Sequence, residues 1–349
     1  MILPFASILL LYATVSNAAL AYKGVDWSSV AVEEAAGKTY KNSAGTTQPL
    51  ETILKASGVN TVRQRLWVAD SSTYNLAYNL KLAARAKAAG LSVYLDMHFS
   101  DTWADPGHQA TPAGWPTDID NLAWKLYNYT LAVSNAFAAQ GITPSIMSIG
   151  NEITDGLLWP LGEYTSFANV ARLLHSASSG IRYSSLGSGP QIMIHLDNGW
   201  NWSTQQWWYS SALAQGTLLS TDYDIMGVSY YPFYNSAATL ASLKTSLTNM
   251  ASTWGKKIIV AETDWPTSCT SPAYAFPSDT TSIPFSAAGQ TTWVKDVAAI
   301  VAGVSGGEGL FYWEPAWIDN AGLGSSCGNN LMVDSTGKAL SSLAVFASI

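Results

Sequence analysis

The chain alternates short apolar segments with longer segments of helical periodicity eight times, and this alternation constrains its fold more than any other feature. The short segments are rich in β-branched residues. The longer ones repeat apolar residues three and four apart, as in residues 76–89, which end before a capping glycine at 90. Eight such units predict an α/β fold, a single (β/α)8 TIM barrel. A doubly wound sheet is the alternative, but it normally has a glycine-rich phosphate turn after an early strand, and none is present.

The expected strands cover residues 22–27, 61–68, 92–98, 145–150, 192–196, 225–230, 257–261 and 309–313. Further helices are expected at 121–139, 167–176, 237–253, 287–302 and 339–347. The segments 99–118 and 265–285 are too irregular for helices. They follow the third and seventh strands, where such barrels place active-site loops.

The first eighteen residues predict export. An apolar run over residues 2–12 is followed by Ser16-Asn17-Ala18, which is typical of a signal peptide (1–18) removed after Ala18. The run is shorter than the roughly 20 apolar residues of a membrane-spanning helix, so we expect no membrane anchor. Residues 19–349 are then one domain, secreted to the extracellular space.

The composition argues against several classes of binding partner. Lys and Arg number 17 against 24 Asp and Glu, a net charge of −7, and no basic run is present, which argues against nucleic-acid binding. Four histidines without ligand spacing predict no metal and no cofactor. Cys269 and Cys327 suit one disulfide in an oxidising compartment. The tripeptides beginning at Asn128 and Asn201 predict N-glycosylation.

Polar and aromatic residues gather where the expected strands end. The fourth strand ends in Asn151-Glu152 and the seventh in Glu262, so two carboxylates reach one mouth of the barrel. Glycoside hydrolysis uses such a pair, one to protonate the leaving oxygen and one to attack or to activate water. Aromatic side chains beside them, including Trp103 and Trp313, match the apolar faces of sugars. The sequence therefore predicts a glycosidase.

The same residues resemble a known family, the retaining endo-β-1,4-galactanases of glycoside hydrolase family 53 and in particular its fungal members. The resemblance spans nearly all of residues 19–349, in order. The matching segments are GVDW (24–27), VRQRLWV (62–68), LDMHFSDTWADPG (95–107), SIGNEI (148–153), LLWPLGE (157–163), IMIHLDNGW (192–200), GVSYYPFY (227–234), AETDWP (261–266), YAFPSD (274–279), YWEPAW (312–317) and AGLGSSC (321–327).

The resemblance implies residue roles: Glu152 is the proton donor and acid/base, and Glu262 is the nucleophile. It also implies cleavage of internal β-1,4-galactosidic bonds in type I arabinogalactan, a pectic galactan, by double displacement. Bacterial members hold calcium near the last two loops, where this chain has its two cysteines. We expect a monomer. The residues implied to line or shape the substrate groove are Arg63, His98, Trp103, Asn151, Tyr230 and Trp313, with Arg65 and Asp101 less specifically matched.

Two alternatives stay open on the residues alone. Residue type cannot separate an axial from an equatorial hydroxyl, so cellulose or mannan could replace galactan as the substrate. A sugar-binding barrel without catalysis, such as a storage lectin, is the other, although the presence of both Glu152 and Glu262 disfavours it.

Overall fold

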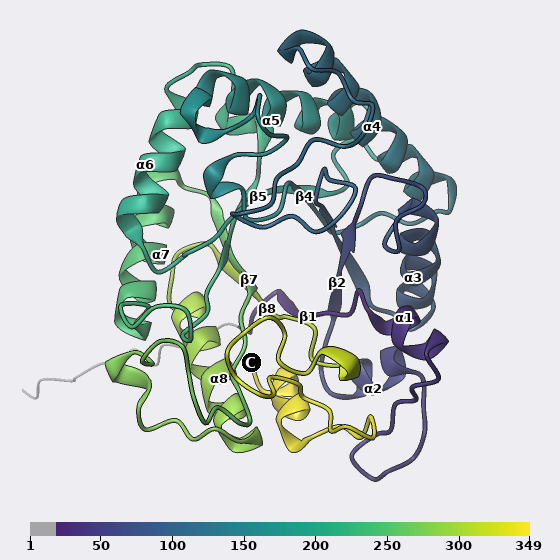
Figure 1. Cartoon of the computed structure of the whole chain (residues 1–349), viewed down its shortest axis with the longest axis vertical. Helices are drawn as coiled ribbons and strands as arrows, with labels where there is room; N and C mark the ends of the chain where they lie inside the picture. Colours follow the sequence, from purple (N-terminus) through teal and green to yellow (C-terminus); the bar gives the residue numbers. More distant parts are fainter. Residues whose placement is uncertain (1–18) are drawn as a thin grey trace, which may run out of the picture.

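The computed structural model describes residues 19–349, in which eight parallel strands close into a barrel in chain order. The predicted (β/α)8 barrel is confirmed, and Figure 1 shows the helices as a ring around the strands. The predicted signal peptide, residues 1–18, lies outside the described part. The strands are β1 (Tyr22–Asp26), β2 (Thr61–Leu66), β3 (Ser92–Met97), β4 (Ile146–Ile149), β5 (Gln191–Leu196), β6 (Ile225–Ser229), β7 (Lys257–Glu262) and β8 (Gly307–Tyr312).

The helices follow the predicted pattern with differences in one helix boundary, in three helices that were not predicted and in the C-terminal segment. The expected helix at 167–176 continues to Arg182, because its serine-rich end still buries an apolar face against the barrel. Helices α1 and α2, of six and seven residues, were not predicted. Helix α6 was not predicted either, since its aromatic residues do not repeat on one face. Residues 341–347 form a 3-10 helix without a side-chain cap, not an α-helix. The helices are α1 (Val30–Ala35), α2 (Leu50–Ala56), α3 (Leu76–Ala88), α4 (Ile119–Ala139), α5 (Phe167–Arg182), α6 (Trp202–Leu213), α7 (Leu240–Trp254) and α8 (Ala287–Ala302).

Side chains fill the barrel interior, so it is a packed core and not a channel. Tyr94 of β3 meets Phe311 of β8 edge-on, with ring centroids 5.2 Å apart. A Cβ atom at Gly24 would come within 2.1 Å of the Phe311 ring, so β1 needs glycine there for this ring to fit. This layer seals the lower end of the barrel beneath the polar residues of the mouth.

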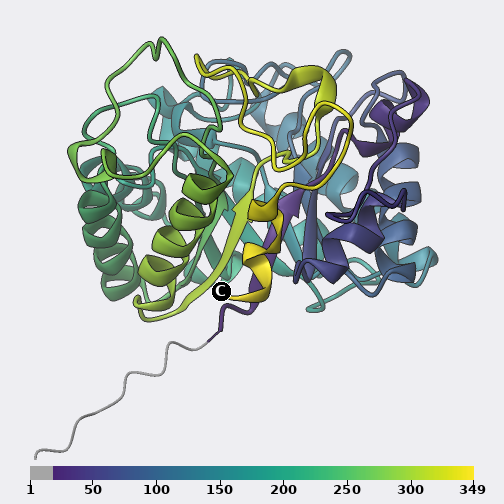
Figure 2. The same cartoon turned by 90° about the horizontal axis from the view of Figure 1, so that it is seen from below.

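The loops that follow the strands gather at one end of the barrel. In Figure 2 they lie along the upper edge, with the C-terminus at the lower edge. Residues 99–118 and 265–285 are largely irregular, as predicted, with one short 3-10 turn at Ser278–Thr280. Cys269 and Cys327 form the predicted disulfide, which ties the loop after β7 to the loop after β8. Within residues 19–349, the structure has no helix of the length and apolarity that a membrane span requires.

Candidate active site

A cavity of about 560 Å³ opens at the loop end of the barrel. Both predicted carboxylates line it, together with two of the predicted tryptophans. Because the strands are parallel, side chains that follow different strands converge on this one space. The principal lining residues are Trp103, Asp105, Glu152, Asp197, Ser229, Tyr231, Tyr234, Glu262, Trp313 and Trp317.

Glu152 enters the cavity from the turn after β4. Its backbone is left-handed, with φ of 48°, and the preceding Gly150 also has a positive φ of 109°, so a sharp turn aims the carboxyl inward. No lysine or arginine forms an ion pair with it among the described residues. Burial first, and the negative charge of Glu262 second, raise the pKa of Glu152 well above its usual range. Glu152 therefore tends to hold its proton.

Glu262 is the last residue of β7 and is held by two donors. Its Oε1 lies 2.7 Å from Nη2 of Arg63, and its Oε2 accepts a hydrogen bond of 2.7 Å from the Tyr231 hydroxyl. Burial raises the pKa of Glu262, but Arg63 and Tyr231 both favour the ionised form and limit that rise. Of the two glutamates, Glu262 is thus the one that ionises first.

The two carboxyl groups lie close together. Oxygens of Glu152 and Glu262 and a ring nitrogen of His195 all fall within 4.8 Å of one another. This spacing fits the ~5–5.5 Å between the carboxyls of retaining glycosidases and is short for the ~6.5–9.5 Å of inverting ones. The same three side chains are also the group of potential metal ligands found in residues 19–349.

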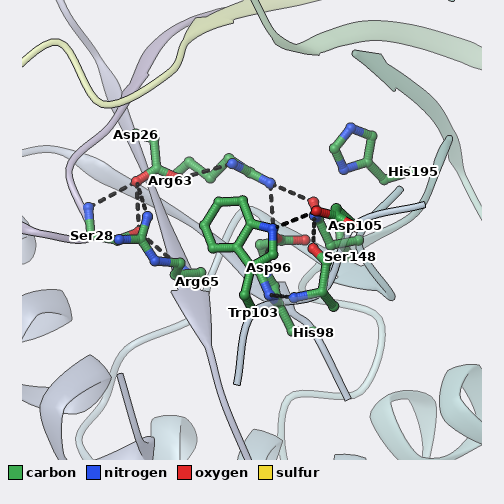
Figure 3. A network of polar contacts seen from close by, with 12 residues as sticks. Asp26, Ser28, Arg63, Arg65, Asp96, His98, Trp103, Asp105, Ser148 and His195 are labelled. Atoms are coloured by element: carbon green, nitrogen blue, oxygen red, sulfur yellow. Dashed lines mark hydrogen bonds and ion pairs between the residues drawn. The ribbon is translucent and has the colours of Figure 1, made fainter. Parts of the chain in front are cut away.

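A buried ionic network under the cavity holds Glu262 in place through Arg63. Figure 3 shows the part of this network around Asp26, Arg63 and Asp96. Arg63 is 1% exposed, and its Nη1 lies 2.9 Å from Asp26 while Nη2 lies 2.7 Å from Asp96. Nη2 also donates to Oδ1 of Asn151, at 2.8 Å. One planar guanidinium thus orients residues from four different strands or strand ends, which a lysine could not do. Arg63 reaches Glu262 from below and is not among the cavity-lining residues.

His98 supports the cavity wall and does not face the cavity. It is 2% exposed, and its Nε2 lies 3.0 Å from Asp96. Its Nδ1 accepts hydrogen bonds from the Trp67 indole and from the backbone N–H of Ala104. With one nitrogen accepting, the ring is neutral, and burial lowers its pKa. The ring packs edge-on against Trp103, at 5.8 Å between centroids. Its predicted part in shaping the groove is therefore indirect.

Three tryptophans form one wall of the cavity. Trp103 and Trp313 meet edge-to-face at 5.7 Å, and Trp313 meets Trp317 at 6.3 Å. The Trp103 indole donates to Asp105 at 2.9 Å, which sets its orientation. Trp265, also at a strand end, is instead fully buried and belongs to the core. All four tryptophans follow strands in the sequence, so their positions alone do not show that Trp265 is in the core and the other three are in the cavity wall.

Arg65 lies beneath this aromatic wall. Its guanidinium is 4.9 Å from the Trp317 ring centroid and 5.6 Å from that of Trp103, and it pairs with Glu314 at 2.7 Å. Burial raises the pKa of Glu314 to about 7 despite that partner. Arg65 thus braces the wall from within the protein. Asp101 supports a loop, where it accepts the backbone N–H of Ala113.

The structure corrects the prediction that Tyr230 lines the groove. Tyr230 is fully buried, donates to the carbonyl of Ala238 at 2.8 Å and stacks on Trp293 at 5.2 Å. Tyr231 lines the cavity instead. The alternation along β6 continues past its end: Ser229 lines the cavity, Tyr230 packs outward in the core, and Tyr231 faces the cavity again.

The remaining predicted side chains are placed as follows. Asn151 is buried, and its Nδ2 donates one proton to the carbonyl of Ala104 at 2.7 Å. Its second Nδ2 proton is not used in that contact.

Asn128 is exposed on the outer face of α4, and Asn201 is the N-cap of α6. The backbone N–H of Asn201 donates at 2.8 Å to the carbonyl of Asn198, which lines the cavity.

Comparison with known proteins gives a consistent result. The model of the family described as "Glycosyl hydrolase family 53" matches residues 22–346. The arabinogalactan endo-beta-1,4-galactanase of Thermothelomyces thermophilus is 65% identical over 333 residues, 95% of this chain and 100% of the relative. That of Humicola insolens is 62% identical over 329 residues, 94% and 99% of the two chains.

Solved structures agree. A structure from work on two fungal beta-1,4-galactanases superposes with a TM-score of 0.94 at 64% identity, over 95% of this chain and all of the other. The Ignisphaera aggregans GH53 catalytic domain follows with a TM-score of 0.82 at 28% identity, over 93% and 95% of the two chains. The Paenibacillus barcinonensis xylanase XynB, at 14% identity and a TM-score of 0.61 over 93% and 95%, shares the fold.

Proposed function

This chain belongs to glycosyl hydrolase family 53, and from that premise we propose that it is a secreted endo-β-1,4-galactanase acting on pectic galactan with retention. The observation that carries the proposal is the pair of unlike carboxyls in one cavity. Glu262 is held by a cation and a hydroxyl, whereas Glu152 has neither an arginine nor a lysine. Two carboxyl groups whose environments differ in this way suit one nucleophile and one acid.

The first chemical step uses both groups. The ionised Glu262 attacks the anomeric carbon and forms a glycosyl ester, while the glycosidic C–O bond breaks. The leaving oxygen takes the proton of Glu152, whose raised pKa keeps that proton available. Oxygens of the two carboxyls lie within 4.8 Å of each other, a spacing that favours direct attack by Glu262 over activation of a water.

The second step reverses these roles. A water gives a proton to Glu152, now a carboxylate, and attacks the anomeric carbon, so that Glu262 leaves as a carboxylate and the product keeps its original configuration. Arg63 stabilises the carboxylate of Glu262 before the first step and after the second. The free Nδ2 proton of Asn151 is suited to the sugar 2-hydroxyl, a contact that strengthens in the transition state.

The cavity walls suit a neutral sugar polymer. Trp103, Trp313 and Trp317 offer apolar ring faces, and Asp105 and Asn198 offer polar atoms at the edge. The chain is expected to act as a monomer outside the cell. The disulfide between Cys269 and Cys327 supports an oxidising environment.

The test has two parts. Purified protein is incubated with potato galactan, cellulose and mannan, and release of reducing ends is measured; galactan should be the preferred polymer. Glu152→Ala and Glu262→Ala are then assayed with azide and an activated aryl β-galactobioside. Azide should yield the β-glycosyl azide with Glu152→Ala and the α-glycosyl azide with Glu262→Ala, because only the second variant lacks the nucleophile. Near-wild-type hydrolysis by either folded variant would refute the assignment.

The two sequons are tested separately. N-glycosylation at Asn128 and Asn201 is expected in the secreted protein, since Asn128 is exposed and the Nδ2 of Asn201 makes no contact within its helix cap. Peptide mass spectrometry before and after enzymatic glycan removal identifies which asparagine is converted to aspartate.

A further inference from the structure

An exposed tryptophan lies one helical turn before the sequon at Asn128. Trp124 of α4 is 64% exposed, although tryptophan side chains are on average largely covered in folded proteins. Tyr127 stacks on Trp124 in nearly parallel orientation, with ring centroids 5.0 Å apart and an angle of 8° between the planes. Neither ring is among the cavity-lining residues. The reaction described above therefore gives this pair of rings no part.

The helix geometry places Asn128 on the open side of Trp124. Successive residues of an α-helix are rotated by about 100°, so Tyr127 lies about 60° to one side of Trp124 and Asn128 about 40° to the other. Tyr127 covers the indole face that is turned toward it. The exposed area of Trp124 therefore comes from the ring edges and from the opposite face, which is turned toward Asn128. A group attached to Asn128 starts beside an uncovered aromatic face.

The Asn128 side chain points back along the helix toward Trp124. Its Nδ2 donates a hydrogen bond of 2.9 Å to the backbone carbonyl of Trp124, because side chains on a helix lean toward its N-terminus. A glycosylated Nδ2 still carries one proton, so it keeps a donor for this hydrogen bond. The Cβ atoms of residues four apart on a helix lie about 5–6 Å from each other, a distance that one pyranose ring spans. The first sugar is thus attached within reach of the indole.

We propose that the first N-acetylglucosamine on Asn128 stacks its apolar face on Trp124, so that the indole lies between the sugar and Tyr127. This inference rests on the proposed N-glycosylation and gives that glycan a binding surface on the protein. In the modification, Nδ2 forms a bond to the anomeric carbon of a lipid diphosphate oligosaccharide, and the diphosphate leaves with one amide proton. One face of a pyranose ring presents C–H groups, which pack well on an aromatic ring. The contact covers exposed apolar surface and stabilises α4.

Hydroxyl-radical footprinting tests the contact directly. The protein is produced in a yeast host and trimmed with an endoglycosidase that leaves one N-acetylglucosamine on each occupied asparagine. Mass spectrometry then measures the occupancy of Asn128 and the rate at which Trp124 is oxidised. This rate should be at least about 2-fold lower in the trimmed glycoprotein than in Asn128→Gln, because a stacked sugar covers the open indole face. Tyr183, which is 77% exposed at the end of α5, is the internal control and should be oxidised equally in both proteins.

A double-mutant cycle measures the effect on stability. Asn128→Gln should lower the Tm of the trimmed glycoprotein by about 1–2 °C more in the wild-type background than in Trp124→Ala, as expected for one aromatic stack in a chain of this length. The cycle cancels the helix propensities of the substituted residues, and Tyr183→Ala in place of Trp124→Ala should show no such difference. Asn128→Gln is preferred to a change at Thr130, whose buried hydroxyl donates to backbone carbonyls of α4 and α5.

The outcomes are distinct. An occupied Asn128 with equal oxidation of Trp124 in the two proteins, or with equal Tm differences in the two backgrounds, would overturn the contact. An unmodified Asn128 would overturn both the proposed glycosylation at this site and the contact that rests on it. Galactan hydrolysis should be the same in all variants, because neither Trp124 nor Asn128 is among the cavity-lining residues. Failure of the contact is therefore separate from failure of the proposed activity.

Discussion

Asp264 is a buried acid without a counterion, and its replacement should stabilise the protein. It lies two residues beyond Glu262 and is fully buried. Neither of its oxygens meets a hydrogen-bond donor in good geometry within residues 19–349. Burial first, and the charge of Glu262 second, raise the pKa of Asp264 well above its usual range, with Glu314 and Asp26 adding to the effect. The folded protein therefore holds this carboxyl in its neutral form.

The sign and size of the effect follow from linkage. In the unfolded chain an aspartate ionises near pH 3.9, whereas the folded Asp264 keeps its proton to a higher pH. Between these two values unfolding releases a proton, so stability falls as pH rises, by up to about 1.4 kcal/mol per pH unit. Asp264→Asn removes this penalty and keeps the shape of the side chain. The stability gained by the variant should grow by about 1.4 kcal/mol between pH 4.5 and 5.5.

Thermal unfolding is a direct assay. With roughly 2 cal/mol/K of unfolding entropy per residue, that gain corresponds to a further rise in Tm of about 2 °C per pH unit for a chain of this length. Wild type and Asp264→Asn are compared at pH 4.0, 4.5, 5.0 and 5.5, with Asp70→Asn, an exposed site, as the control that should show no such trend. A Tm difference that is constant or shrinks with rising pH would refute the argument that Asp264 is neutral.

Three further substitutions test the site and its frame. Arg63→Lys keeps the charge but not the planar fork, so it should destabilise the protein by roughly 3 kcal/mol in urea unfolding and lower activity; unchanged stability would contradict the network's role. Tyr231→Phe should reduce kcat on galactan about 10-fold or more with little change in Tm. Tyr230→Phe should leave kcat nearly unchanged and lower the free energy of unfolding by about 1 kcal/mol. A loss of kcat in Tyr230→Phe and a loss of stability in Tyr231→Phe would instead support the prediction that Tyr230 lines the groove. Replacing Cys269 and Cys327 by serine should cost roughly 4 kcal/mol in the chain-entropy model, and equal melting with and without the bridge would exclude that contribution.

The fold was readable from the sequence because its signals are local. Each strand and most helices carry their own apolar period, and parallel strands that alternate with helices leave few closed arrangements. Helix α6 was missed because its tryptophans spread around the helix. The segment from Ser341 was misread because a short apolar pattern does not distinguish an α-helix from a 3-10 helix.

Part of the site was readable for the same reason. Glu152 and Glu262 each follow a strand, and strand ends meet at one mouth in a barrel, so their convergence follows from chain order. The pairing of the two cysteines followed from their number and from the expected export.

The contacts that distinguish the site residues from one another were determined by the tertiary structure. Tyr231 donates a hydrogen bond to Glu262, whereas Tyr230 stacks on Trp293 in the core. The sequence shows that Arg63, His98 and His195 are present. It does not show their hydrogen-bond partners, because those partners lie on other strands. Hydrogen-bond direction, burial and the pKa of each carboxyl depend on atoms far apart in sequence. Composition and periodicity therefore predicted a barrel with two acids at its mouth, and only close packing gave Glu262 a cation and a hydroxyl as partners and left Glu152 without a cation.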